Sequence, residues 1–155
     1  MIGDSVKLLV FALRGLRHAV PLAQVERVVS AAQVTPVPRA PAIVLGVIDL
    51  HGRIVPVLDV HHDANGGVPA LQLSDQFLIV QTPLRTVALL VDETHGVIER
   101  DAAAISYLAP ALSSPGRGDG VVRLGDGLAV IHDVESFLSA HESRLLDEAL
   151  AAALP

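Results

Sequence analysis

Residues 44–60 read V-L-G-V-I-D-L-H-G-R-I-V-P-V-L-D-V, and this stretch decides the fold. Two runs of Val, Ile and Leu flank His51-Gly52-Arg53, and residues of this kind are enriched in strands. Gly52 supplies the backbone freedom that a tight reversal needs. The stretch therefore predicts a β-hairpin.

A weaker copy of this hairpin lies near the C-terminus. Residues 120–134 read G-V-V-R-L-G-D-G-L-A-V-I-H-D-V, and the glycine, the first valine, the leucine before the turn and the closing Asp-Val match residues 46–60 at an offset of 74. At an offset of 68, Leu16-Arg17 matches Leu84-Arg85 and Leu22 matches Leu90. Both offsets are close to half of the 155 residues, which favours a duplication that gives two related five-stranded units. Chance similarity between short aliphatic strands is the alternative.

Apolar runs elsewhere predict further strands at residues 6–13, 18–22, 77–81 and 86–91, with a short one at 97–98. Val25, Val28 and Val29 are spaced by three and four residues, which predicts a short helix over 23–29. Three prolines between residues 36 and 41 predict an extended crossing. Residues 61–74 and 113–119 have the composition of surface loops.

The C-terminal residues 134–154 have the pattern of an amphipathic helix, with Asp133 as a candidate N-cap. We expect residues 1–138 to form the domain, its two intertwined barrels dividing near residues 61–76, and residues 139–155 to form a helical extension. The extension either packs back on a barrel or docks on a partner or a second copy.

Composition excludes several classes of protein. The net charge of −6 argues against nucleic-acid binding, which depends on clustered Lys and Arg. The chain has no Cys, so it forms no disulfide, thiol nucleophile or Cys-ligated zinc site. No apolar stretch approaches the roughly 18 residues that span a membrane, and Met1-Ile2-Gly3-Asp4 does not resemble a signal peptide. We expect a soluble, cytoplasmic protein without direct membrane insertion.

The sequence also lacks the motifs of common active sites. There is no G-x-G-x-x-G before a helix, no G-x-x-x-x-G-K-S/T and no G-x-S-x-G. His61-His62-Asp63 is the best metal candidate, but adjacent side chains on a strand end point in opposite directions. His132-Asp133 could orient an imidazole, but no serine motif stands beside it. We expect no enzyme activity, no cofactor and no metal; a small metal- or ligand-binding barrel centred on residues 61–63 remains the alternative from another class.

The order of the apolar blocks resembles the CheW family of bacterial chemotaxis coupling proteins. The blocks are L-L-V-F-A-L (8–13), A-V-P-L-A-Q-V (19–25), T-P-V-P-R-A-P (35–41), residues 44–60 and L-L-V-D-E-T-H-G-V (89–97). The resemblance covers roughly residues 6–138. It implies a mainly β fold of two small five-stranded SH3-like barrels packed as one body, with a short helix after the second strand and a C-terminal α-helix.

The resemblance further implies an adaptor without catalysis in a chemosensory array. Its expected partners are the cytoplasmic tip of a methyl-accepting chemoreceptor, the regulatory domain of a CheA-type histidine kinase and other CheW-like proteins. The array would hold this cytoplasmic protein near the membrane. Within the same class, the alternative is a diverged scaffold that binds a non-standard kinase or assembles with itself.

Carried over residue by residue, the family's surfaces predict a receptor groove between the barrels. Val25 is the apolar contact, Thr94 and Val97 lie on the facing strand, and Asp92 ends the V-D strand. The complete set of expected partner-binding residues is Val25, Arg27, Leu45, Asp49, His51, Gly52, Arg53, Asp92, Thr94 and Val97.

The chain departs from the family pattern at two of these positions. The family usually reads N-L-R-G at the hairpin turn, where this chain has D-L-H-G, and it usually has an acid where this chain has Arg27. An acid and an arginine would thus be replaced by Arg27 and His51, so that an imidazole would stand where the family has a guanidinium that is always charged. Arg53 could replace the arginine, but we expect it to point to the other face.

Overall fold

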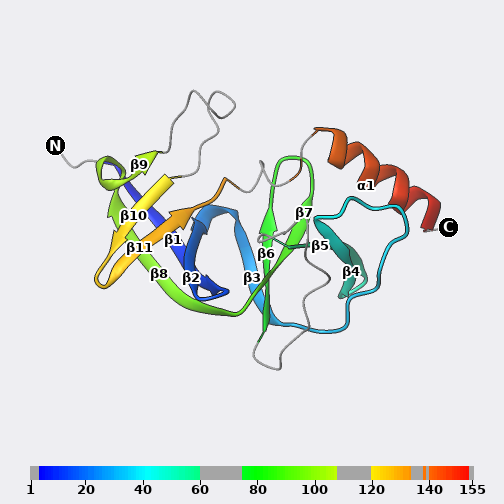
Figure 1. Ribbon diagram of the computed structural model, residues 1–155, viewed down its shortest axis with the longest axis horizontal. Coiled ribbons are helices and arrows are strands. Elements are labelled where there is room, and N and C mark those ends of the chain that lie inside the picture. Colours follow the sequence, from blue (N-terminus) through cyan, green and yellow to red (C-terminus); the bar gives the residue numbers. More distant parts are fainter. Residues whose placement is uncertain (1–3, 60–74, 108–119, 134–137, 139, 154–155) are drawn as a thin grey trace.

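The computed structural model describes residues 4–59, 75–107, 120–133, 138 and 140–153 (Figure 1). Its strands and helices follow in the order β1 (Ser5–Leu13), β2 (Leu16–Pro21), the 3₁₀ helix η1 (Leu22–Gln24), β3 (Val25–Ser30), β4 (Val44–Leu50), β5 (Arg53–Leu58), β6 (Gln76–Gln81), β7 (Thr86–Val91), β8 (Glu93–Asp101), η2 (Ala102–Ala104), β9 (Ser106–Tyr107), β10 (Gly120–Leu124), β11 (Gly127–Ile131) and α1 (Ala140–Ala153).

The strands form two sheets, which we call barrel 1 and barrel 2. Barrel 1 has the order β8-β1-β2-β11-β10-β9, in which β9 is a two-residue addition to five longer strands. Barrel 2 has the order β3-β6-β7-β5-β4. All neighbouring strands are antiparallel except β11 beside β2 and β5 beside β7. The expected mainly β fold of two small barrels is confirmed.

The two barrels are internal copies of one another, and the strand registers match residue by residue. Leu8 pairs with Pro21 in barrel 1 and Phe77 pairs with Leu90 in barrel 2, so that both residue numbers differ by 69. The β1–β8 and β6–β3 ladders are related in the same way: Leu9 pairs with Val97 and Leu78 pairs with Val28, so that one residue number rises by 69 and the other falls by 69. The β4–β5 and β10–β11 hairpins differ by 74 throughout. The second predicted offset, 68, was therefore wrong by one residue, while 74 is confirmed.

Each barrel combines strands from both halves of the chain. Barrel 1 takes β1 and β2 from the first half and β8, β10 and β11 from the second; barrel 2 takes β3, β4 and β5 from the first and β6 and β7 from the second. Figure 1 shows the blue β1 and β2 beside the yellow and orange β10 and β11. The halves are consequently interlocked.

The hydrophobic cores follow the same symmetry. The interior of barrel 1 contains Leu8, Val10, Ala19, Val122, Ala129 and Ile131, and the equivalent residues Phe77, Ile79, Ala88, Ile48, Val55 and Val57 fill barrel 2. The opposite faces of the strands meet in a third cluster, which we call the junction core; it joins Leu9, Phe11 and Val20 to their equivalents Leu78, Val80 and Leu89. Buried aliphatic area of this extent is the main stabilising term of the fold.

Helix α1 packs back on the molecule. Leu146 is fully buried in the junction core, and Leu138 and Leu150 pack against that core. At the rim, Arg85 Nη2 donates to Ser143 Oγ (3.0 Å) and to Asp147 Oδ1 (2.6 Å). In this chain the apolar face of the helix is thus used within the molecule itself.

Several local predictions differ from the structure. The helix after the second strand is only the 3₁₀ turn η1, and Val25–Ser30 form a strand. The short strand at 97–98 is the centre of the nine-residue β8. Asp133 does not cap α1, because that helix begins seven residues later, at Ala140. The extended crossing is confirmed: Thr35 forms a bridge with Val47, and residues 31–43 contain no helix. The predicted loops at 61–74 and 113–119 lie outside the described residues, as does the metal candidate at 61–63.

Candidate partner-binding surface

The expected partner-binding residues fall into two groups. Val25, Arg27, Leu45, Asp49, His51, Gly52 and Arg53 belong to barrel 2, whereas Thr94 and Val97 lie on β8 of barrel 1, with Asp92 just before that strand. Strands β3 and β8 occupy equivalent places at one edge of each sheet. Val25 is the symmetry equivalent of Thr94, and Val28 of Val97, since these numbers differ by 69.

Equivalent valines on the two edge strands differ in exposure. Val28 packs against the junction core, as does Val25. Val97 pairs with Leu9 of that core but keeps 52% of its surface exposed. An exposed β-branched residue in mid-strand leaves apolar area that a partner would gain free energy by covering. The chain therefore places an uncovered valine on barrel 1 where barrel 2 has a covered one.

Both edge strands carry a β-bulge at the equivalent position. In β3 the extra residue is Glu26, because Val25 pairs with Val80 and Arg27 with Ile79. In β8 it is His95, because Thr94 pairs with Phe11 and Gly96 with Val10. Bulges change the direction of side chains on an edge. Here they direct two polar side chains, Glu26 and His95, away from the regular alternation.

Glu26 is the centre of a charged cluster on barrel 2. Its Oε2 accepts from Arg53 Nη2 (2.6 Å), its Oε1 accepts from Gln81 Nε2 (2.8 Å), and Arg27 Nε lies 3.6 Å away. Hydrogen bonds from Arg53 and Gln81 lower the pKa of the Glu26 carboxyl below its ordinary value. The cluster therefore presents a fixed carboxylate between two guanidinium groups.

This cluster corrects one inference from the sequence. Arg53 does not turn away from the acid on β3, and the chain retains an acid–arginine pair as Glu26 with Arg53. The bulge in β3 explains this pair, because the extra residue, Glu26, leaves the regular alternation and reaches Arg53 of the β4–β5 hairpin. Glu26 was missed, although an acid directly after Val25 on a strand was visible in the sequence.

The hairpin turn is held by a side chain as well as by its backbone. His51 (φ 53°) and Gly52 (φ 87°) both have the positive φ values of a two-residue type I′ turn, and Asp49 Oδ1 accepts from Gly52 N (2.7 Å). His51 is exposed at the tip of the hairpin. Asp49 therefore has a structural role, and His51 is the residue that the turn presents.

Three of the remaining predicted residues also have structural roles. Asp92 Oδ2 accepts from Arg14 N (2.8 Å), which ties the β7–β8 connection to the β1–β2 turn. Thr94 donates from N (2.8 Å) and Oγ1 (3.2 Å) to Gln76 Oε1, which joins β8 to β6 of the other barrel. Leu45 is the bulge residue of β4 and packs against the interior of barrel 2.

Within the residues described, no group of three or more His, Cys, Asp or Glu side chains is placed to hold a metal ion. None of the helices in that part of the chain is long and apolar enough to cross a membrane. The surface features described are strand edges, turns and a charged cluster on two interlocked barrels.

Comparison with known proteins identifies the family. The family model described as CheW-like domain matches residues 7–142, and the chain belongs to this family. The chain is 23% identical to the chemotaxis protein CheW of Treponema pallidum over 92% of its own length and 88% of the relative's. It is 26% identical to the CheW protein of Klebsiella aerogenes, with 94% and 90% covered. The solved structure of the scaffolding protein CheW from Thermoanaerobacter tengcongensis superposes with a TM-score of 0.75 at 23% identity, covering 91% of this chain and 92% of that one, and so has the same fold.

Proposed function

We propose that this protein is a non-catalytic adaptor that couples the cytoplasmic tip of a chemoreceptor to the regulatory domain of a CheA-type histidine kinase. Membership of the CheW-like family and similarity over nearly whole chains to chemotaxis proteins support the assignment. The protein would act in the cytoplasm, in a receptor array at the membrane.

One observation supports receptor binding most directly, namely the exposure of Val97 on the edge strand β8. A partner that covers Val97 would extend the junction core across β8, toward Leu9. Fully burying an aliphatic side chain contributes about 1.5–3 kcal/mol, and a partner would gain roughly half of this at Val97, which is 52% exposed. The contact would therefore strengthen binding of an apolar receptor segment while changing nothing within the barrels.

The test is Val97→Arg in a binding assay with the purified receptor tip and with the purified kinase. We expect receptor affinity to fall by about tenfold or more, since tenfold corresponds to about 1.4 kcal/mol. The matched control is Leu84→Arg, which changes a leucine that is 81% exposed in the β6–β7 turn. Both variants should melt near the wild-type temperature. Unchanged receptor binding by Val97→Arg would contradict the proposal.

Val25→Arg gives a second test on the equivalent strand, and the same loss of binding is expected. Because Val25 packs against the junction core, the thermal melting of the variant protein must be measured together with its binding. A variant that melts like the wild type and still binds receptor and kinase would remove Val25 from the proposed surface.

The charged cluster on barrel 2 favours one alternative, a diverged scaffold with a non-standard partner. The acid–arginine pair is built from Glu26 and Arg53, while Arg27 and His51 occupy the positions where the family has an acid and an arginine. The substitution His51→Arg distinguishes the standard adaptor from the diverged scaffold. Preserved or stronger coupling to a standard receptor and kinase supports the first proposal, and a clear loss supports a surface rebuilt for another partner.

The alternative from another class, a metal-binding barrel, is tested by metal analysis of the purified protein. Stoichiometric zinc would overturn the adaptor assignment. We expect none, because the sequence offers only His61-His62-Asp63 as a candidate and neighbouring side chains diverge.

A further inference from the structure

An exposed apolar patch lies on the outside of barrel 1, where β2 and β11 run side by side. Leu16 at the start of β2 is 56% exposed, and Leu128 near the start of β11 is 59% exposed. The parallel ladder pairs His18 with Val130, and the same register carried back two residues sets Leu16 opposite Leu128. An ion pair between Arg17 and Asp126 holds the two strand starts together. We call this patch the β2–β11 face.

The internal symmetry identifies the equivalent surface of barrel 2. Leu16 corresponds to Arg85 (difference 69) and Leu128 to Ile54 (difference 74), at the start of the parallel β7 and β5. Helix α1 occupies that surface: Arg85 binds Ser143 and Asp147, and Leu146 is buried in the cluster that contains Val87 and Leu58. In barrel 2, therefore, an amphipathic helix covers the Arg85 and Val87 side of this surface, while Ile54 stays 42% exposed.

The residues that underlie this surface differ between the two barrels. The equivalents of Val87 and Leu58 in barrel 1 are His18 and His132, whose rings lie 4.9 Å apart with Nδ1 of His18 2.7 Å from Nε2 of His132. Phe11 stacks on His18 at 5.6 Å. His18 is only 6% exposed, so these stacked rings lie largely inside the protein. Barrel 1 therefore has histidine rings where barrel 2 has Val87 and Leu58, and its exposed apolar groups at this position are Leu16 and Leu128.

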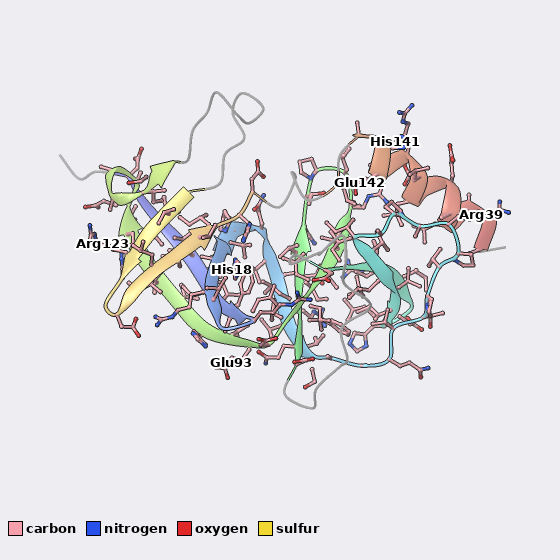
Figure 2. All side chains as sticks on the ribbon, in the orientation of Figure 1. His18, Arg39, Glu93, Arg123, His141 and Glu142 are labelled. Carbon is pink, nitrogen blue, oxygen red and sulfur yellow. The ribbon has the colours of Figure 1, made fainter. Side chains whose placement is uncertain are left out.

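The charges around the β2–β11 face suit an acidic partner. Arg123 pairs with Leu128 across β10 and β11, so its side chain lies on the same face, and Figure 2 shows it on the outside of barrel 1. Arg14 is exposed in the turn before Leu16 and its backbone N donates to Asp92, while Arg17 pairs with Asp126, so that three arginines stand against two aspartates. The rim therefore carries more positive than negative charge, although the whole chain is acidic.

We propose that the β2–β11 face binds an amphipathic α-helix of a partner protein, whose apolar side covers Leu16 and Leu128 and whose acidic flank faces Arg14 and Arg123. Helix α1 shows the chemistry required: Glu142, Asp147 and Glu148 against Arg144, beside a leucine and alanine face. The chain's own α1 does not serve, because Leu146 and Arg85 hold it on barrel 2. The site is separate from Val97 and does not depend on the proposed receptor contact.

The test uses the full-length protein and a synthetic peptide with the sequence of residues 140–153 as a model acidic helix. In an NMR titration we expect saturable binding, with shift changes centred on Leu16, Arg17, Arg123 and Leu128. Leu128→Glu and Leu16→Glu should each weaken binding by about tenfold or more, since they remove apolar area and add a repelling charge. The matched control is Ile54→Glu, the symmetry equivalent of Leu128→Glu, which should bind normally.

Two further arms define the outcome. A peptide with Glu142→Lys, Asp147→Lys and Glu148→Lys should lose binding, and the affinity for the original peptide should fall as salt rises. Absence of peptide binding, or shift changes confined to barrel 2 through exchange with α1, overturns the proposal. A concentration-dependent dimer that Leu128→Glu abolishes assigns the face to a second copy and overturns the partner helix. Val97→Arg should leave peptide binding intact, so failure here is distinguishable from failure of the receptor proposal.

Discussion

Glu26 is the residue whose environment most alters the meaning of the surface. It is an acid on a bulge, bonded to Arg53 and Gln81 and close to Arg27, and its side chain is about one-fifth exposed. Those contacts are made by the ionised carboxylate. The cluster therefore depends on pH as well as on the residues that form it.

Because the pKa of Glu26 is lowered in the folded protein, its contribution to stability is present above the pKa of the unfolded chain and is lost as pH falls through the folded value. An unperturbed Glu titrates near about 4.3. We expect Glu26→Gln to lower the melting temperature at pH 7, and we expect this difference from the wild type to shrink as pH falls from the unfolded value through the lower pKa of the folded protein. The control is Glu99→Gln, an exposed acid on β8. A difference between wild type and Glu26→Gln that stays constant with pH would contradict this account.

Gly46 is a second position where a single residue decides local structure. Its φ is +150°, and a Cβ added there would lie 2.3 Å from the backbone oxygen of Thr35 on the proline-rich crossing. Backbone cannot retreat as a flexible side chain can, so Gly46→Ala should destabilise the fold by about 1–3 kcal/mol in urea unfolding. Gly125→Ala, where no atom lies within 4 Å of the added Cβ, should be nearly neutral.

The sequence allowed the hairpin around His51 and Gly52 to be predicted, because turn residues and strand runs are local signals. It did not allow the partner of Arg53 to be predicted. That contact joins residues 27 positions apart through a bulge, whereas a strand pattern predicts a regular alternation of side chains. Contacts that depend on a register shift are not visible in a single sequence.

At the scale of elements, the same bulge explains why β3 was predicted to be a helix. One extra residue at Glu26 puts Val25 and Val28 on the same face, three positions apart, so a strand acquires a spacing typical of a helix. Val29 packs against the interior of barrel 2 instead. The length of β8 was underestimated, because its residues are mostly polar and its bulge and Gly96 break the alternation typical of a strand.

Helix α1 is the element whose attachment is easiest to test. Leu146 is fully buried in the junction core, and Leu→Ala changes at such sites cost about 2–5 kcal/mol. We expect Leu146→Ala to lower the free energy of unfolding by this amount in urea titration. Leu84→Ala, at an 81% exposed leucine, should change it by less than about 0.5 kcal/mol. Equal effects of the two substitutions would mean that the helix is not part of the cooperative fold.

At the scale of the whole molecule, the duplication was visible in the sequence and two intertwined barrels were expected, but the strands that each barrel takes from each half were not predicted. Two offsets indicated two related units, and hairpin ladders offset by 74 confirm it. A repeat in the sequence suggests that each half folds into its own barrel. In the structure each barrel instead needs both halves, because β1 and β2 pair with β8 and β11 while β3 pairs with β6. Long-range pairing of this kind leaves no local signal.

Interlocking has a direct thermodynamic consequence. Each barrel contains strands from both halves of the chain, so unfolding one barrel also pulls on segments that continue into the other. In addition, the junction core joins Leu9 and Phe11 of barrel 1 to Leu78 and Val80 of barrel 2. We expect a single calorimetric transition whose calorimetric and van't Hoff enthalpies agree. Val122→Ala in barrel 1 and Val55→Ala in barrel 2 are the same substitution at a buried core position of each barrel, and each should lower the midpoint of that one transition. If either substitution separates the melt into two steps, the barrels are independent units, and a partner bound to one barrel would leave the stability of the other unchanged.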